Sequence, residues 1–165
     1  MTTGIVYYSK TGNTKAVAQF LAEKLKQQNA AVDLIEIEAV KRPGFFRAGR
    51  AAMKQIELPI KNTDVDLGKY STLIVGSPTW AGCCTPFIKT FFSSAKNMKG
   101  KKTALFVTSG GAPDPQGKPR QMMQQNLTNA GMNLSDSFLG LQMRKGSIVA
   151  GEQHIEKFIQ SVLEK

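Results

Sequence analysis

Residues 9–14 combine side chains that could hold a phosphate group. The segment reads Ser-Lys-Thr-Gly-Asn-Thr, so it offers three hydroxyls, an amide, a lysine and a glycine. Hydroxyls and backbone N–H groups at the start of a helix satisfy phosphate oxygens, and the helix dipole favours the anion. The same residue types also form ordinary N-capping turns. We interpret the turn as a phosphate cradle, and its candidate binding residues are Ser9, Lys10, Thr11, Gly12, Asn13 and Thr14.

A second segment, residues 76–82, reads Gly-Ser-Pro-Thr-Trp-Ala-Gly and contains the only tryptophan of the chain. An indole offers a large aromatic face on which a flat ligand can stack, although the same ring could instead pack as core over the sheet edge. A glycine after the tryptophan frees the neighbouring peptide to adopt conformations that other residues resist. The candidate binding residues here are Pro78, Thr79, Trp80, Ala81 and Gly82.

A third segment, residues 109–117, begins Ser-Gly-Gly and is rich in glycine and proline. Adjacent glycines let the backbone approach a ligand closely, but a plain flexible connector has the same composition. Its candidate binding residues are Ser109, Gly110 and Gly111.

Several other phosphate chemistries do not fit the first turn. Neither the GxxxxGK[ST] loop nor the GxGxxG fingerprint occurs there, so nucleotide hydrolysis is not expected. A response regulator needs a carboxylate, and a thiol phosphatase needs a cysteine, where this chain has Tyr8 and Ser9.

The elements around these segments alternate between strands and helices. Short β-rich runs occupy residues 4–8, 32–37, 72–75 and 103–108, and a weaker run occupies residues 133–139. Helical spacing or capping signals predict helices over residues 12–28, 86–92, 118–130 and 155–163. This alternation predicts a parallel sheet with helices on both faces. Ligands of such sheets bind at the carboxyl ends of the strands, where all three segments lie.

Together, residues 9–14, 78–82 and 109–111 resemble the flavodoxin family over essentially the whole chain. The resemblance implies an α/β flavodoxin-like three-layer sandwich, in which a five-stranded parallel sheet has the order 2-1-3-4-5. It also implies FMN as cofactor, with the first turn on the phosphate, Trp80 against the isoalloxazine and the loop from Ser109 at the pyrimidine end. The Ala81–Gly82 peptide matches the one that turns its carbonyl toward flavin N5 upon one-electron reduction.

Two features depart from that family. Flavodoxins commonly place a second aromatic residue in the third loop, whereas residues 109–118 contain none. The other flavin face is then covered by Pro113, by methionines or by a partner, or it is open. The carriers of the family are typically acidic, whereas 22 Lys and Arg against 12 Asp and Glu give this chain a net charge of +10.

The excess charge suggests an anionic partner, although a solvated basic surface is an equal alternative. Residues 41–54 contain five basic residues and no acid. We predict that this basic segment helps to dock an acidic redox partner, and that nucleic acid is an unlikely ligand. The alternative is that the segment is a solvated loop or a short helix in place of the second crossover. The five residues are Lys41, Arg42, Arg47, Arg50 and Lys54.

The remaining signals are less specific. A length of 165 residues predicts one domain, residues 1–165, and no apolar stretch is long enough to span a bilayer, so a cytoplasmic location is expected. His154 has no neighbour at metal-ligand spacing, and no metal is predicted. Cys83 and Cys84 are adjacent, which disfavours a structural disulfide. We interpret them as reduced, packed thiols, although a following helix N-terminus could lower a thiol pKa.

Three functions follow from this reading. The first is an electron carrier in which FMN exchanges electrons between redox partners and no side chain acts as a catalyst. The alternative is an NAD(P)H-dependent quinone or flavin reductase on the same fold, favoured by an open flavin face. The third is a flavin-free domain that uses its basic segment to bind an acidic partner or nucleic acid.

Overall fold

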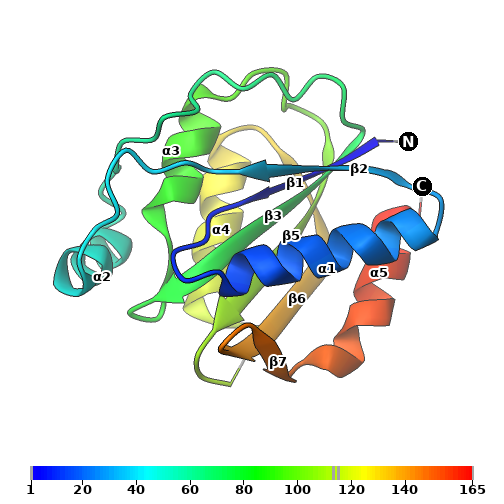
Figure 1. Cartoon of the computed structure of the whole chain (residues 1–165). Coiled ribbons are helices and arrows are strands. Elements are labelled where there is room, and N and C mark those ends of the chain that lie inside the picture. Colours follow the sequence, from blue (N-terminus) through cyan, green and yellow to red (C-terminus); the bar gives the residue numbers. More distant parts are fainter. Residues whose placement is uncertain (1, 113, 115, 165) are drawn as a thin grey trace.

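The five predicted strands form the centre of one mostly parallel sheet (Figure 1). The computed structural model describes residues 2–112, 114 and 116–164. Along the sheet the strands follow the order β2-β1-β3-β5-β6-β7, and the short strand β4 pairs with the end of β3. Their bounds are β1 Thr2–Tyr7, β2 Ala31–Glu36, β3 Thr72–Trp80, β4 Cys83–Cys84, β5 Lys102–Ser109, β6 Asn133–Arg144 and β7 Ser147–Ala150. The predicted order 2-1-3-4-5 is therefore confirmed, and the strands β4 and β7 are antiparallel additions to it.

The helices cover both faces of the sheet, as predicted. Their bounds are α1 Asn13–Gln27, α2 Phe45–Lys54, α3 Pro86–Ser94, α4 Lys118–Asn129 and α5 Ile155–Leu163, with a 3₁₀ turn η1 at Glu152–His154. Helices α1 and α5 lie on one face, and α3 and α4 lie on the other (Figure 1). This arrangement is the flavodoxin-like three-layer sandwich.

Alternate residues of the central strands enter two separate cores. In β1 and β3, Val6 and Val75 pack on the side of α3 and α4. Their neighbours Ile5 and Ile74 pack on the side of α1 and α5. A strand covered on both faces needs apolar residues at successive positions, which explains the short continuous apolar runs of the sequence.

The connection from β2 to β3 differs from the other crossovers. The short helix α2 occurs within the basic segment, and residues 55–71 then return over the sheet as an extended chain (Figure 1). This return segment is held by its apolar residues, which enter the core on the α3 side: Leu58, Ile60, Leu67 and Tyr70. Residues 45–54 thus form the short helix considered for the second crossover, while docking of a partner by this segment stays a prediction.

The second predicted loop requires a correction, because β3 continues through residues 76–80 to Trp80. Only Ala81 and Gly82 form a turn, with φ values of 48° and 72°, and this turn joins β3 to the antiparallel strand β4. Two-residue hairpin turns with positive φ at both positions match the twist of the strands. The glycine, serine and proline at positions 76–78 resemble loop residues in the sequence, but they pair with β5.

The reason for glycine at position 76 is the ring of Phe106. A Cβ atom added to Gly76 would lie 2.0 Å from Cζ of Phe106, which is fully buried. The ring fills the space that a side chain at position 76 would need, so β3 can continue past Val75 only with glycine there.

We predict that Gly76→Ala lowers the free energy of unfolding by about 1–3 kcal/mol or more, because the buried ring and the backbone must separate. Denaturant unfolding measures the effect. Gly111→Ala is the control, since its added Cβ has nothing within 4 Å. Phe106→Leu in the Gly76→Ala background should recover part of the loss. Equal unfolding midpoints for Gly76→Ala and Gly111→Ala would contradict this account.

Candidate functional site

A hollow of about 210 Å³ lies where β1, β3 and β5 end. Residues from all three predicted segments line this first hollow, so the fold brings together segments separated by up to about a hundred positions. The lining residues are Lys10, Thr11, Asn13, Thr14, Pro78, Thr79, Trp80, Thr108, Ser109 and Gly110.

The turn before α1 is held by Ser9, which does not line the hollow. Its Oγ accepts hydrogen bonds from the backbone N–H groups of Gly12 (3.1 Å) and Lys15 (3.2 Å). Gly12 is the N-cap of α1 and has a φ of 95°, a conformation that favours glycine. Ser9 and Gly12 therefore shape the turn, whereas Thr11, Asn13 and Thr14 face the hollow.

Two buried hydroxyls join the first turn to the end of β5. The Oγ1 atoms of Thr14 and Thr108 lie 2.8 Å apart, in hydrogen-bond contact. Sequence analysis assigned Thr108 only to a strand. Only one feature of the sequence could have indicated that Thr108 belongs to the site: its hydroxyl lies at the end of that strand, directly before Ser109.

The side chain of Asn13 connects the first turn to another part of the chain: its Oδ1 accepts a hydrogen bond from the N–H of Gly146 (2.9 Å). Gly146 lies between β6 and β7, so the hairpin added to the predicted sheet supports the N-terminus of α1. The Oδ1 of Asn13 is therefore engaged with the protein, although the residue also lines the hollow.

Thr79, which lines the hollow, provides a buried polar atom without a partner. Its Oγ1 is buried and makes no hydrogen bond within the described part of the chain. An unpartnered buried hydroxyl costs free energy unless a ligand supplies its partner. A ligand with polar atoms therefore fits this position.

Lys10 and Trp80 form one rim of the hollow. The Lys10 ammonium donates to the carbonyl of Pro43 (2.9 Å) and lies 5.5 Å from the centre of the Trp80 ring. The Trp80 ring also makes edge contacts with Tyr8 (5.6 Å between ring centres) and Phe87 (6.0 Å). Trp80 thus combines the two roles considered from the sequence: it packs partly on the core and also lines the hollow.

A second hollow of about 260 Å³ adjoins the first and shares Thr79 and Ser109 with it. Gly82, Lys118 and Phe138 are among its other lining residues. Phe138 lies in β6 and was not a predicted site residue, because nothing in its local sequence links it to the third loop. It supplies an aromatic ring beside a loop that has none. Pro113, a sequence-based candidate to cover the flavin, lies outside the described residues.

Not all predicted residues line the first hollow. Gly82 lines only the second hollow, while Ala81 forms the hairpin turn with it. The carbonyl of Gly111 accepts a hydrogen bond from Ser109 Oγ (2.6 Å), which fixes the start of the third loop. A larger hollow of about 680 Å³ lies between β6 and α5; it shares Phe138 and Gly140 with the second hollow and contains none of the predicted binding residues.

Both cysteines are packed inside the protein. Cys83 and Cys84 are free and buried. Burial, with a smaller contribution from Cys83, raises the pKa of the Cys84 thiol to about 12, so this thiol stays protonated at neutral pH.

The described residues contain no group of three or more His, Cys, Asp or Glu that could hold a metal ion. None of the described helices is long and apolar enough to cross a membrane.

The donor set of the first hollow suits an anionic, polar and partly aromatic ligand. Its described lining contains hydroxyls, an amide, a lysine and an indole, and none of these described residues is acidic. A phosphate ester on a hydroxylated chain that carries a flat ring system matches these groups, and FMN has this composition.

Comparisons with known proteins agree with this chemistry. The sequence profile of the family described as NADPH-dependent FMN reductase matches residues 5–143. The chain is 29% identical over 164 residues to NAD(P)H dehydrogenase (quinone) 3 of Rhizobium meliloti (strain 1021), an alignment that covers 91% of this chain and 74% of that protein. The alignment with a relative from Nitrobacter winogradskyi, also called NAD(P)H dehydrogenase (quinone), covers only 53% of the relative. Part of each relative thus has no aligned counterpart here.

Among solved structures, a flavoprotein from Lactobacillus acidophilus in complex with FMN superposes with a TM-score of 0.62 at 22% identity, covering 94% of this chain and 97% of that chain. Flavodoxin 2 from Bacillus cereus superposes with a TM-score of 0.61 at 20% identity, covering 99% and 96%. These likenesses confirm the flavodoxin-like fold, and together with the family match they confirm FMN as the expected cofactor.

We predict that Thr11→Asp weakens FMN binding at least about tenfold, because a carboxylate at this exposed position would repel a phosphate in the turn. Thr11→Asn is the matched control, since it has the same size without the charge. Riboflavin, which lacks the phosphate, should bind both variants equally well. Flavin fluorescence titrations measure the affinities, and equal FMN affinities of the two variants would remove the phosphate from this turn.

We also predict that Thr79→Val weakens FMN binding about tenfold without lowering stability, because the unpartnered hydroxyl loses a hydrogen bond that only a ligand can make. Thr85→Val is the control, since the Thr85 hydroxyl is likewise buried without a partner but does not line either hollow. If both variants bind FMN like the original chain, Thr79 does not contact the cofactor.

Proposed function

Because this chain belongs to the NADPH-dependent FMN reductase family, we propose that it is an FMN-dependent oxidoreductase that oxidises NAD(P)H and reduces a quinone. In the net reaction NAD(P)H gives up a hydride, and the quinone takes two electrons and two protons, the second proton coming from water. The observation that carries the proposal is the pair of adjoining hollows at the ends of the central strands, which brings phosphate-binding groups, the Trp80 indole and a second aromatic ring, Phe138, together at one site. The names of the relatives support the choice of reactants.

We assign the first hollow to FMN. Thr11, Gly12 and Thr14 would hold the phosphate through hydroxyl and backbone groups at the N-terminus of α1, and Lys10 would add positive charge. Bound FMN supplies the two-electron chemistry that no side chain provides. The groups proposed to fix the remainder of the cofactor are Asn13, Pro78, Thr79, Trp80, Ser109 and Gly110.

The second hollow would receive the exchanging reactants in turn. Phe138 offers a ring on which a nicotinamide or a quinone can stack, and the Arg120 guanidinium lies 5.0 Å from the centre of that ring. Lys118 and Asp114 also line the hollow, one charge of each sign, and Lys118 would pair with a phosphate of the reactant. Thr79 and Ser109 would contact both the cofactor and the reactant, because they line both hollows.

A second candidate function is the electron carrier expected from the sequence. The observation that favours it is the basic segment around α2, whose five Lys and Arg side chains are all exposed and could dock an acidic redox protein. In that case NAD(P)H would not reduce the protein, and the second hollow would have no reactant.

We predict that the FMN-loaded chain oxidises NADH or NADPH in the presence of a water-soluble benzoquinone, faster than an equal concentration of free FMN. The absorbance of the nicotinamide measures the rate, and quinol formation should match it one to one. If neither nucleotide is oxidised while the chemically reduced protein passes electrons to an acidic redox protein, the carrier function holds and the reductase proposal fails.

A further inference from the structure

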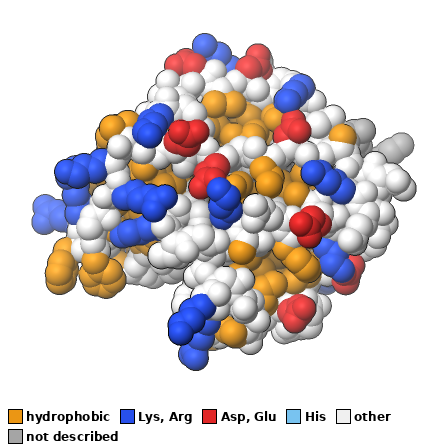
Figure 2. Space-filling model, in the orientation of Figure 1, with side chains coloured by type: hydrophobic (Ala, Val, Ile, Leu, Met, Phe, Trp, Pro, Cys, Tyr) orange, Lys and Arg blue, Asp and Glu red, His pale blue; other side chains and the backbone are white. Residues whose placement is uncertain are grey.

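The helix α2 carries an unusual exposed surface. Phe45 and Phe46 are 83% and 88% exposed, and their ring centres lie 5.6 Å apart. Met53 on the same helix is 56% exposed. Single exposed apolar residues are common on protein surfaces, but a cluster of large ones marks a contact surface. Figure 2 shows exposed hydrophobic and basic side chains together at the left edge of the molecule, where Figure 1 places α2.

The helix has three distinct sides. At 100° per residue, Phe45, Met53 and Phe46 share an arc of about 100°, which also contains the partly buried Gly49. Arg50, Lys54 and Arg47 occupy the adjacent arc, and the buried residues Ala48, Ala51 and Ala52 occupy the third. The exposed part of the helix is therefore amphipathic in its own right, with an aromatic arc beside a basic one.

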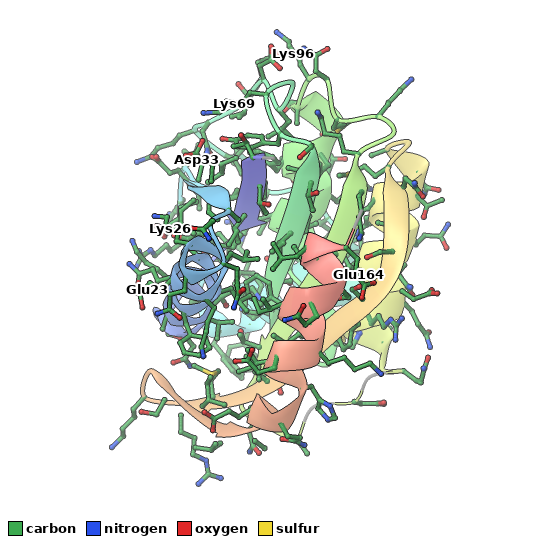
Figure 3. The ribbon with its side chains drawn as sticks, turned by 90° about the vertical axis from the view of Figure 1, so that its right-hand side faces the viewer. Glu23, Lys26, Asp33, Lys69, Lys96 and Glu164 are labelled. Atoms are coloured by element: carbon green, nitrogen blue, oxygen red, sulfur yellow. The ribbon has the colours of Figure 1, made fainter. Side chains whose placement is uncertain are left out.

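The charge around this surface has one sign. No acidic residue occurs between Glu38 and Glu57, while Lys41 and Arg42 precede the helix. Elsewhere the charges are mixed: Figure 3 labels Glu23, Asp33 and Glu164 together with Lys26, Lys69 and Lys96, whereas α2 lies on the left in Figure 1. The segment around α2 therefore differs from that side in carrying basic residues without acids.

The helix is also fixed to the candidate site. A Cβ atom on Gly49 would lie 3.5 Å from Cβ of Ala81, so α2 contacts the turn between β3 and β4. The side-chain amide of Gln55, at the end of α2, donates to the carbonyl of Cys84 (3.2 Å) and accepts from Asn126 (2.8 Å). Whatever binds α2 is therefore held close to the rim of the hollows.

We propose that α2 binds the surface of a membrane that contains anionic lipids, with Phe45 and Phe46 inserted among the headgroups and the basic arc on the lipid phosphates. Aromatic residues beside Lys and Arg are the composition of interfacial helices, and basic residues near an anionic surface add to the affinity. This surface would orient the site toward the bilayer, where lipid-soluble quinones are found. That last consequence rests on the proposed function, whereas lipid binding does not.

A lipid surface fits these observations better than an acidic protein. Charge alone would suit either partner, but two almost fully exposed phenylalanines need an apolar environment that a flat acidic protein surface does not supply. A bilayer interface supplies both the anionic groups and the apolar layer beneath them.

The test uses flotation of the FMN-loaded chain with vesicles of phosphatidylcholine that contain phosphatidylserine, and with vesicles of phosphatidylcholine alone. We expect binding to the anionic vesicles that falls as salt is raised. The double variant Arg47→Gln, Arg50→Gln should bind about thirtyfold more weakly. The double variant Phe45→Ser, Phe46→Ser should bind at least about tenfold more weakly. Circular dichroism and retained FMN show that the variants are folded.

The matched control is Lys26→Gln with Lys96→Gln, which removes the same charge from the side shown in Figure 3 and should keep most of the binding. Equal losses in this control, or no binding of the original chain to anionic vesicles, would overturn the proposal. Binding to an acidic redox protein without vesicle binding would overturn the proposal as well. The surface would then serve to dock an acidic redox partner, as expected from the sequence.

A separate measurement concerns the quinone. The Phe45→Ser, Phe46→Ser variant should lose activity with a long-chain quinone embedded in anionic vesicles and keep its activity with a water-soluble quinone. If no variant oxidises NAD(P)H but the vesicle binding behaves as expected, the proposed function fails while the membrane surface stands.

Discussion

The structure depends on the burial of β1, β3 and β5 on both faces of the sheet. Because these strands are parallel neighbours, their carboxyl ends meet at one edge, and the three segments that follow them must emerge side by side. Apolar residues at successive positions hold the strands between the two helical layers. The position of the site thus follows from the order of the strands in the sheet. Its polar groups lie just beyond the apolar residues that end the buried strands.

Much of the fold could be predicted from the sequence, because each central strand and most helices leave a local pattern. The run of apolar residues before Ser9, the proline that begins α3 and the apolar stripe of α5 are signals within a few neighbouring positions. The extension of β3 could not be predicted in this way. Gly76 resembles a loop residue in the sequence, but it is glycine because of the ring of Phe106, a contact between distant positions that no local pattern records.

The same limit applies to the site. The three segments were visible because hydroxyl, glycine and tryptophan residues are concentrated in them. Thr108 and Phe138 were missed because each lies inside a strand pattern, and only the register of β5 and β6 places them beside the hollows. Likewise, the charge of residues 41–54 was evident, but the exposure of Phe45 and Phe46 was not, because apolar residues in a short helix usually face the core.

The hydroxyl of Ser9 has a consequence for the energetics of cofactor binding. It accepts hydrogen bonds from the amide of Gly12 in the turn and from the amide of Lys15 in the first turn of α1, so contacts within the chain order this turn when the chain folds. A cofactor that binds there meets a preorganised turn, and little of its binding free energy is consumed in ordering the backbone. The apoprotein should therefore be a folded and competent acceptor, which can lose its cofactor and load it again without passing through an unfolded state.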